Sequence, residues 1–306
     1  MTAAQTSSPK RAFERVLVPV DGSEPAAAAL RFGLALTGQG TALVLVHVSD
    51  RTHGLRVPLD SREIADALES RARAVLDEAV QLCRSESVEP VVEFLYDRPV
   101  AGILGAARRH ACDLVILGTH ARQIIPQAFL GSTTVGVLRL SEIPVLTVRA
   151  ITPSRPQPFG SALVAVDDSE PSDAAVLYAA HLKESIGTQL VICSAVDVNA
   201  VFQSSAESGF DPTEVIASMN AGARSAIDHA LAGASLVLPP DALELVEGEA
   251  VQAILATAER RNVDLIVVGS HGRRGLRHFV LGSVAEHVVR RSTLPVLVVR
   301  RPRASG

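Results

Sequence analysis

The segment "VDLIVVGSHGRRGLRHFVLGS" occupies residues 263–283 and joins a continuous apolar run to a stretch rich in glycine and arginine. The apolar run is typical of a buried strand in a parallel sheet that helices cover on both faces. Three glycines follow with the spacing Gly269-x2-Gly272-x9-Gly282, and Ser283 comes next. Helical periodicity begins at "VAEHVVRR" (284–291). The segment therefore predicts a strand, a glycine-rich loop and a helix in succession.

The same pattern occurs earlier in the chain, so the sequence contains an internal repeat. "RVLVPVDGSEPAAAALRFGLAL" (15–36) resembles "SALVAVDDSEPSDAAVLYAAHL" (161–182), and residues 112–149 resemble residues 263–300. We expect a flexible N-terminal extension, a first unit, a proline-rich linker and a second unit, over residues 1–12, 13–149, 150–160 and 161–301.

Each unit alternates short apolar runs with helical patterns, which favours an α/β fold with a parallel sheet. In the first unit we expect strands near residues 16–20, 42–48, 91–96, 113–118 and 144–149, with a helix over 61–84. In the second unit we expect strands near residues 162–167, 189–195, 242–247, 264–269 and 295–300.

Polar residues mark where several helices begin. "SEP" follows the first strand of each unit, so Ser23 and Ser169 are predicted N-caps. Asp60 and Glu63 have the spacing of a capping box for the helix over 61–84. The polar stretch 199–212 is predicted to be a loop, and the alternative is a lid over a ligand.

Composition excludes several classes of function. The formal net charge of −4 gives no reason to expect a nucleic-acid partner. Only two of the 29 basic residues are lysines and neither follows a glycine-rich loop, so a Walker A site is excluded. Three dispersed cysteines, no secretory signal and no apolar run long enough for a membrane span predict a cytoplasmic protein that does not contact a membrane.

The glycine-rich segment has the features of an anion site. The first N–H groups of a helix have no partner within the helix and attract anions, and Gly282 and Ser283 stand at such a start. Gly269 and Gly272 would let the backbone approach a phosphate, with Gly272 in a left-handed conformation. Arg273, Arg274 and Arg277 either offset phosphate charge or are simply solvated.

These motifs, together with "ALVAVDDSE" (162–170) at the start of the second unit, resemble the universal stress protein family. The resemblance implies two tandem five-stranded parallel-sheet domains, Rossmann-like and of the adenine nucleotide α-hydrolase type. It also implies ATP, alone or with Mg²⁺, bound between the first and fourth strands. In this sequence the implied nucleotide-binding residues are Asp167, Ala195, Val268, Gly269, Gly272, Arg273, Gly282, Ser283 and Val284.

Asp167 has two interpretations. An acidic side chain beside a triphosphate holds either a ribose hydroxyl or a phosphate-bound Mg²⁺. The alternative is that Asp167 caps the helix that follows it.

The first unit departs from the motif. The residues in register with the second-unit site are Asp21, Val48, Gly118, Gly131 and Ser132. Ala121 replaces the middle glycine, and Arg122 is the one arginine of this loop. A methyl group at a left-handed position costs about 1 kcal/mol and would crowd a phosphate, so we expect the second unit to hold the nucleotide.

Three classes of function remain open: a nucleotide-binding regulator with a role in the stress response, a slow ATPase or phosphotransferase, and a ligand-free scaffold. The sequence shows no catalytic constellation, so we predict no catalytic residues and, at most, weak ATP hydrolysis.

The last strands of the two units, "IPVLTVR" (143–149) and "LPVLVVR" (294–300), are strongly β-prone. Exposed strand edges are usually paired or covered, so we expect the units to pair as an intramolecular pseudo-dimer, with a further homodimer as an option.

Overall fold

The computed structural model describes residues 11–37, 40–50, 62–119, 130–150, 159–198, 201–202, 205, 211–272 and 281–300, without the side chains of residues 62–65 and 68. The expected N-terminal extension, the linker, the stretch 199–212 and the Asp60–Glu63 capping box lie wholly or largely outside this part of the chain. The domain boundaries drawn from the sequence therefore stay predictions.

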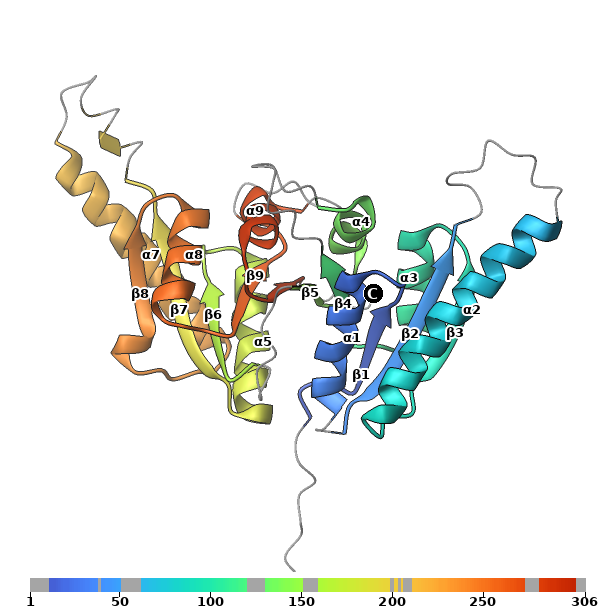
Figure 1. Cartoon of the computed structure of the whole chain (residues 1–306). Helices are drawn as coiled ribbons and strands as arrows, with labels where there is room; N and C mark the ends of the chain where they lie inside the picture. The colour runs from blue at the N-terminus through green and yellow to red at the C-terminus, as the bar shows by residue number, and fades with distance from the viewer. Residues whose placement is uncertain are drawn as a thin grey trace, which may run out of the picture.

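The structure is an α/β fold in which strands and helices alternate in both units (Figure 1). The described elements of the first unit are β1 (Arg15–Pro19), α1 (Glu24–Thr37), β2 (Ala42–Ser49), α2 (Arg62–Ser85), β3 (Val91–Tyr96), α3 (Pro99–Arg109), β4 (Leu114–Thr119), α4 (Ser132–Leu140) and β5 (Val145–Arg149). Those of the second unit are β6 (Ser161–Ala165), α5 (Glu170–Ile186), β7 (Gln189–Val196), α7 (Pro212–Gly233), the 3-10 helix η1 (Pro240–Ala242), β8 (Leu243–Glu247), α8 (Ala250–Arg260), β9 (Leu265–Gly269), α9 (Ser283–Arg291) and β10 (Val296–Val299). Every predicted strand is present, with ends within two residues of those expected.

The strands form one 10-stranded sheet in the order β3-β2-β1-β4-β5-β10-β9-β6-β7-β8. Within each unit the neighbouring strands are parallel. The first strand of each unit lies between its second and fourth strands, so strand order reverses at β1/β4 and at β6/β9. Ligands of open parallel sheets bind beyond the carboxyl ends of strands at such a point.

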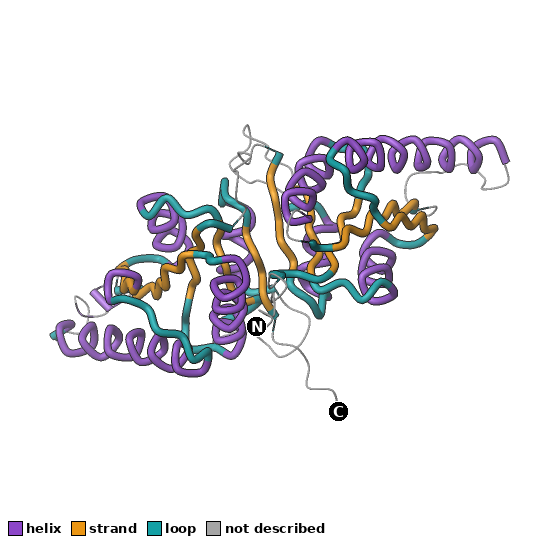
Figure 2. The backbone as a smooth tube through the Cα atoms, turned by 90° about the horizontal axis from the view of Figure 1, so that it is seen from below, coloured by secondary structure: helices purple, strands orange, loops and turns teal. Residues whose placement is uncertain are grey.

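The two units meet at β5 and β10, which pair antiparallel in the middle of the sheet (Figure 2). Leu146 lies opposite Leu297, its equivalent in the repeat, and Val296–Thr147 and Val298–Val145 pair on either side. The register is therefore that of a pseudo-twofold axis through the central leucine pair. The predicted pairing of the last strands is confirmed.

Helices cover both faces of the sheet. On one face α1, α2, α5 and α7 contribute to a single apolar core, and on the other face α3, α4, α8 and α9 contribute to a second core. Each core contains residues of both units. Phe159 is 1% exposed, and its ring lies 6.1 Å from that of Phe13 and 5.3 Å from that of Phe32, so the aromatic contacts also join the units.

The three cysteines behave as small buried hydrophobes, as the sequence predicts. Cys83, Cys112 and Cys193 are buried and free. Burial raises the pKa of each thiol to about 11, which keeps it protonated and unreactive at neutral pH.

Candidate functional site

The candidate site lies at the β6/β9 switch point. Leu163 pairs with Ile266 and Val164 with Val267, which brings the carboxyl ends of these two strands together. Gly269 ends β9, and Asp167 follows the end of β6 by two residues. The two segments that the sequence singled out therefore meet at one edge of the sheet.

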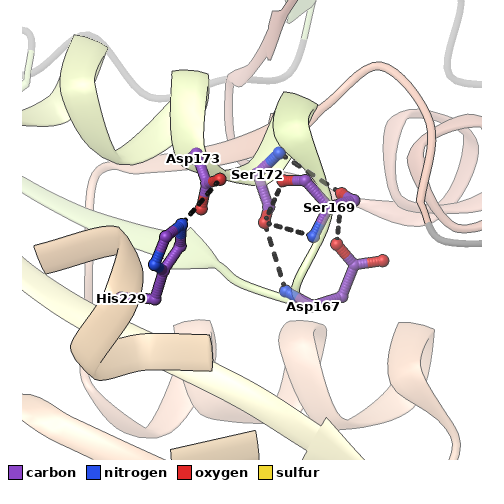
Figure 3. A network of polar contacts seen from close by, with 5 residues as sticks. All are labelled: Asp167, Ser169, Ser172, Asp173 and His229. Carbon is purple, nitrogen blue, oxygen red and sulfur yellow. Dashed lines mark hydrogen bonds and ion pairs between the residues drawn. The ribbon is translucent and has the colours of Figure 1, made fainter. Parts of the chain in front are cut away.

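Asp167 is held by a small network of serine hydroxyls (Figure 3). The Ser169 hydroxyl donates to Asp167 Oδ1 and lies 3.4 Å from the His271 carbonyl oxygen. Ser172 is 3% exposed, and its hydroxyl donates to the Ser169 carbonyl at 2.9 Å and accepts from the Asp167 N–H at 3.4 Å. Ser169 therefore fixes one carboxylate oxygen of Asp167, and Ser172 fixes its backbone N–H.

Ser169 also begins the helix that follows. It is the N-cap of α5, its side chain accepts from the Ser172 N–H, and the reciprocal bond completes a capping box. The predicted role of Ser169 is confirmed, and the N-cap is this serine rather than Asp167. Asp167 is thus placed as a half-buried carboxylate at the switch point and not as the helix cap.

Gly272 lies against Asp167. A Cβ at Gly272 would sit 2.3 Å from Asp167 Oδ2, a distance at which the carboxylate must move. The expectation of a left-handed backbone at Gly272 is wrong, because its φ lies outside the positive range in which glycine is favoured. The glycine is required by the close approach of the loop to Asp167 rather than by backbone conformation.

The two other glycines of the motif also serve close packing. A Cβ at Gly269 would lie 2.7 Å from the carbonyl carbon of Pro171 in α5, and one at Gly282 would lie 2.8 Å from the Cα of His271. The Gly282 N–H donates to the Ser270 carbonyl at 2.8 Å, so both ends of the loop over 273–280 lie side by side. Gly269 is explained by the packing of α5 on β9, while Gly272 and Gly282 shape the loop.

The N-terminus of α9 opens beside this loop. Gly282 is its N-cap and has no side-chain capping bond, and Ser283 and Val284 are exposed. The first backbone bond within α9 runs from the Glu286 N–H to the Gly282 carbonyl at 2.9 Å. The preceding N–H groups of the first turn are thus the kind of donors that bind anions.

The other residues predicted to bind the nucleotide are Ala195, Val268 and Arg273. Ala195 is half-buried on β7, two residues beyond Cys193, which pairs with Ala165 of β6. Val268 is 3% exposed and packs in the core, so only its backbone can face a ligand. Arg273 lies outside the described residues, as do Arg274 and Arg277.

Asp167 is the described carboxylate at this site that could take part in binding a metal ion. Among the described residues, no group of three or more histidine, cysteine or acidic side chains is placed to hold a metal. Mg²⁺ in nucleotide sites is commonly bound by one or two carboxylates together with substrate phosphates and water. The half-buried Asp167 carboxylate fits that accessory role and no closed protein site.

A second acidic residue, Asp173, lies in the first turn of α5. Asp173 Oδ2 is 3.9 Å from His229 Nε2 of α7, while Asp173 Oδ1 is buried without a hydrogen-bond partner (Figure 3). Burial raises the pKa of Asp173, His229 lowers it, and the nearby carboxylates of Asp168, Asp167 and Glu170 raise it further. The start of α5 is therefore strongly acidic.

The equivalent place in the first unit is built differently. Asp21 is exposed and accepts from the Ser23 N–H at 2.9 Å within its own loop. Ala26 stands where the second unit has Ser172, so the buried hydroxyl of the network is missing. Among the described residues nothing lies within 4 Å of a Cβ added at Gly131, but His120, which corresponds to the His271 that Gly282 packs against, lies outside them.

Other first-unit residues occupy the same structural positions as their equivalents in the second unit. A Cβ at Gly118 would lie 2.1 Å from the Pro25 carbonyl carbon, so Gly118 serves the same helix packing as Gly269. Val48 is half-buried at the end of β2, and Ser132 begins α4. Ala121 and Arg122 lie outside the described residues.

The role of Ser172 is not evident from the local sequence pattern. The usual signal of a capping box is Glu or Gln three residues after the N-cap, and this chain has a serine there. A comparison of the two repeats, with Ala26 opposite Ser172, carries the signal that could have found it.

Two regions of the chain, residues 12–149 and 158–300, match the model of the universal stress protein family. The chain belongs to the universal stress protein family. It is 25% identical over 305 residues to universal stress protein Rv2005c of Mycobacterium tuberculosis, covering 94% of this chain and 97% of that protein. It is 45% identical over 60 residues to universal stress protein MJ0531 of Methanocaldococcus jannaschii, covering 20% of this chain and 35% of that protein.

The fold of this universal stress protein is shared with a solved structure. The crystal structure of a universal stress protein from Archaeoglobus fulgidus is similar with a TM-score of 0.71 and 24% identity, covering 94% of this chain and 98% of the other. Among the described residues, no helix has the length and apolar character that crossing a membrane requires.

Proposed function

We propose that this universal stress protein binds an adenine nucleotide, ATP, in its second unit and acts as a nucleotide-responsive regulator. The observation that carries the proposal is the contact between Gly272 and Asp167 at the β6/β9 switch point, where a Cβ would lie 2.3 Å from the carboxylate. A simple turn does not require a glycine in contact with an acidic side chain. A loop that passes close to a ligand-binding carboxylate does require a glycine there, because any side chain would displace the carboxylate.

The phosphates are assigned to the N-terminus of α9. Backbone donors at Ser283 and Val284, the positive end of the helix dipole and the Ser283 hydroxyl favour an anion there. The exposed side chains of this turn leave it accessible. Gly269, Gly272, Gly282 and the backbone at Val268 form the proposed path of the phosphates and ribose, with Arg273 as a further candidate.

Asp167 is proposed to accept hydrogen bonds from the ribose or to hold a phosphate-bound Mg²⁺. Ser169 bonds to the carboxylate and Ser172 to the backbone N–H of Asp167, which supports a binding role, because a pre-oriented group costs less entropy when the ligand binds. The backbone around Ala195 is assigned to the adenine, because it lies at the same sheet edge.

The first unit is proposed to bind nucleotide weakly or not at all. Asp21 is exposed and bonded within its own loop, and no serine corresponds to Ser172. We assign the second site, Asp21, Val48, Gly118, Gly131 and Ser132, a mainly structural role.

A binding measurement tests this proposal. The protein is incubated with excess Mg-ATP, desalted and denatured, and the released nucleotide is identified and counted by mass spectrometry. We expect about one adenine nucleotide per chain, and a parallel incubation with GTP should give much less. Two nucleotides per chain would show that the first unit also binds, and none would favour the scaffold function.

A further inference from the structure

We propose that the first unit positions the nucleotide-binding helix of the second unit, with Arg139 and Arg149 as the positioning residues. The inference rests on the proposed function, since it concerns the same site. The two arginines reach across the β5–β10 junction to opposite ends of α9, whose N-terminus is the proposed phosphate site.

The first contact is at the start of α9. Glu286 lies in the first turn of this helix and forms an ion pair at 2.7 Å with Arg290 of the same helix. Its other carboxylate oxygen, Oε2, lies 3.7 Å from the guanidinium of Arg139 in α4. Arg139 and Arg290 are equivalent positions of the repeat, so the two units each supply one guanidinium to a single carboxylate.

The negative charge of Glu286 lies close to the proposed phosphate site. A helix turn is 5.4 Å long, so Glu286 lies within about one turn of the proposed phosphate donors and inside a Debye length of about 8 Å at physiological ionic strength. A negative charge there opposes an anionic ligand, and Arg139 adds a second positive charge to the one that Arg290 supplies. The side chain of Glu286 is only 22% exposed, so its charge is poorly screened by water.

The second contact is at the end of α9. The Arg149 guanidinium, at the end of β5, donates to the carbonyl of Arg290 in the last turn of the helix. A cation at a helix C-terminus interacts favourably with the dipole and satisfies a carbonyl that has no partner within the helix. The first unit thus holds α9 at both ends.

Among the described residues, the second unit makes fewer such contacts with α4, the equivalent helix of the first unit. Arg300 of the second unit donates to the Leu138 carbonyl near the end of α4 at 3.5 Å, one residue before the equivalent of the Arg290 carbonyl that Arg149 contacts. The first turn of α4, however, has no acidic residue, and Val135 stands where α9 has Glu286. The pairing of a first-turn carboxylate with an arginine of the other unit is therefore found at α9 and has no equivalent at α4.

The test is isothermal titration of Mg-ATP into the full chain and its variants. We expect Arg139→Ala to weaken ATP binding about two- to five-fold, as suits a half-exposed ion pair. Arg139→Lys should bind nearly as well as the wild type, because the positive charge remains. In a Glu286→Gln background, Arg139→Ala should cause no further loss, because there is no carboxylate left to neutralise.

Arg300→Ala is the matched control for Arg149→Ala. Both remove one guanidinium that crosses the junction, but Arg149 donates to a carbonyl of α9 whereas Arg300 donates to a carbonyl of α4. We expect weaker ATP binding for Arg149→Ala and unchanged binding for Arg300→Ala, with thermal unfolding without nucleotide confirming that each variant folds.

The outcomes separate the two proposals. If the wild type binds ATP and Arg139→Ala and Arg149→Ala bind it equally well, the positioning role is overturned while the proposed function stands. Equal losses for Arg149→Ala and Arg300→Ala, or a loss for Arg139→Ala that persists in the Glu286→Gln background, would also overturn it. If the wild type does not bind ATP, both proposals fail.

Discussion

Gly272 is the residue at which the candidate site tolerates least change. It lies against Asp167, and an added methyl group would be 2.3 Å from Oδ2. We predict that Gly272→Ala displaces the Asp167 carboxylate and weakens ATP binding at least ten-fold, measured by calorimetric titration. The fold should persist, because the backbone of Gly272 is not in the left-handed region and suffers no added strain.

Gly222 provides the control for this substitution. It lies exposed on α7, and no atom of the described residues lies within 4 Å of an added Cβ. Gly222→Ala should leave ATP binding unchanged and stabilise the protein by about 0.5–1 kcal/mol, because alanine is the better helix former. Wild-type affinity in Gly272→Ala would remove the main support for the phosphate loop.

Ser169 has two roles, as the N-cap of its helix, α5, and as a hydrogen-bond donor to the Asp167 carboxylate. Ser23, its equivalent in the first unit, separates these roles because it has only the first of them. Ser23 accepts from the Ala26 N–H at 3.3 Å at the start of α1, as Ser169 does from Ser172 in α5. Loss of an N-cap costs about 1 kcal/mol, so Ser23→Ala and Ser169→Ala should destabilise the protein similarly in chemical unfolding.

Only Ser169→Ala should also weaken ATP binding, because Ser169 bonds to the Asp167 carboxylate and Ser23 does not. The comparison requires titrations of both variants under one set of conditions. A similar affinity in the two variants would mean that the serine acts on the helix alone.

At the scale of elements, the first turn of α5 makes a pH-dependent contribution to stability. The folded-state pKa of Asp173 is raised above its ordinary value of 3.8, mainly by burial. Folding therefore favours the protonated acid, and this contribution is present below pH 3.8 and is lost as pH rises through the raised pKa. At neutral pH the ionised Asp173 costs stability, since its Oδ1 is buried without a hydrogen-bond partner.

We predict that Asp173→Asn unfolds at a higher temperature than the wild type at pH 7, and that the difference shrinks as the pH falls toward 4. Thermal unfolding between pH 4 and 7 measures it. Asp228→Asn on α7 is the control, because Asp228 is 59% exposed and pairs with Arg224 on the surface. A gain that is independent of pH would show that the Asp173 charge is not its cause.

The elements of this fold could be predicted from the sequence because their signals are local. A continuous apolar run such as residues 264–269 predicts a buried strand, and the structure has β9 at Leu265–Gly269. Ser169 was identifiable as a cap from its position before a helix. The site was less predictable, because its close contacts depend on the tertiary structure.

Gly272 illustrates the difference. The sequence explains a glycine by a left-handed turn, whereas the structure explains it by the proximity of Asp167, which lies 105 positions earlier in the chain. The contacts of Arg139 with Glu286 and of Arg149 with α9 likewise need the register of β5 on β10, which no local pattern specifies.

At the scale of the whole molecule, the two units share one sheet and both apolar cores. Both apolar cores run through both units, and the sheet is continuous across the β5–β10 pair. Tyr178 of the second unit also lies 3.4 Å, through its hydroxyl, from the Asp113 carbonyl of the first. We therefore predict a single unfolding transition in scanning calorimetry.

Phe159→Ala tests this cooperativity. Phe159 is 1% exposed between the units, so its truncation should cost about 3–5 kcal/mol and lower the temperature of that single transition. Phe202→Ala, at a position 52% exposed, should change it little. Two separate transitions, with only one of them shifted, would show that the units unfold independently.

The most direct measurement of the central claim locates the nucleotide in the chain. The protein is photolabelled with 8-azido-ATP, with and without competing ATP, then digested, and the labelled peptides are identified by mass spectrometry. We predict that labelling suppressed by ATP falls within residues 161–301. Labelling confined to residues 13–149, or labelling that ATP does not suppress, would contradict the assignment of the nucleotide site to the second unit.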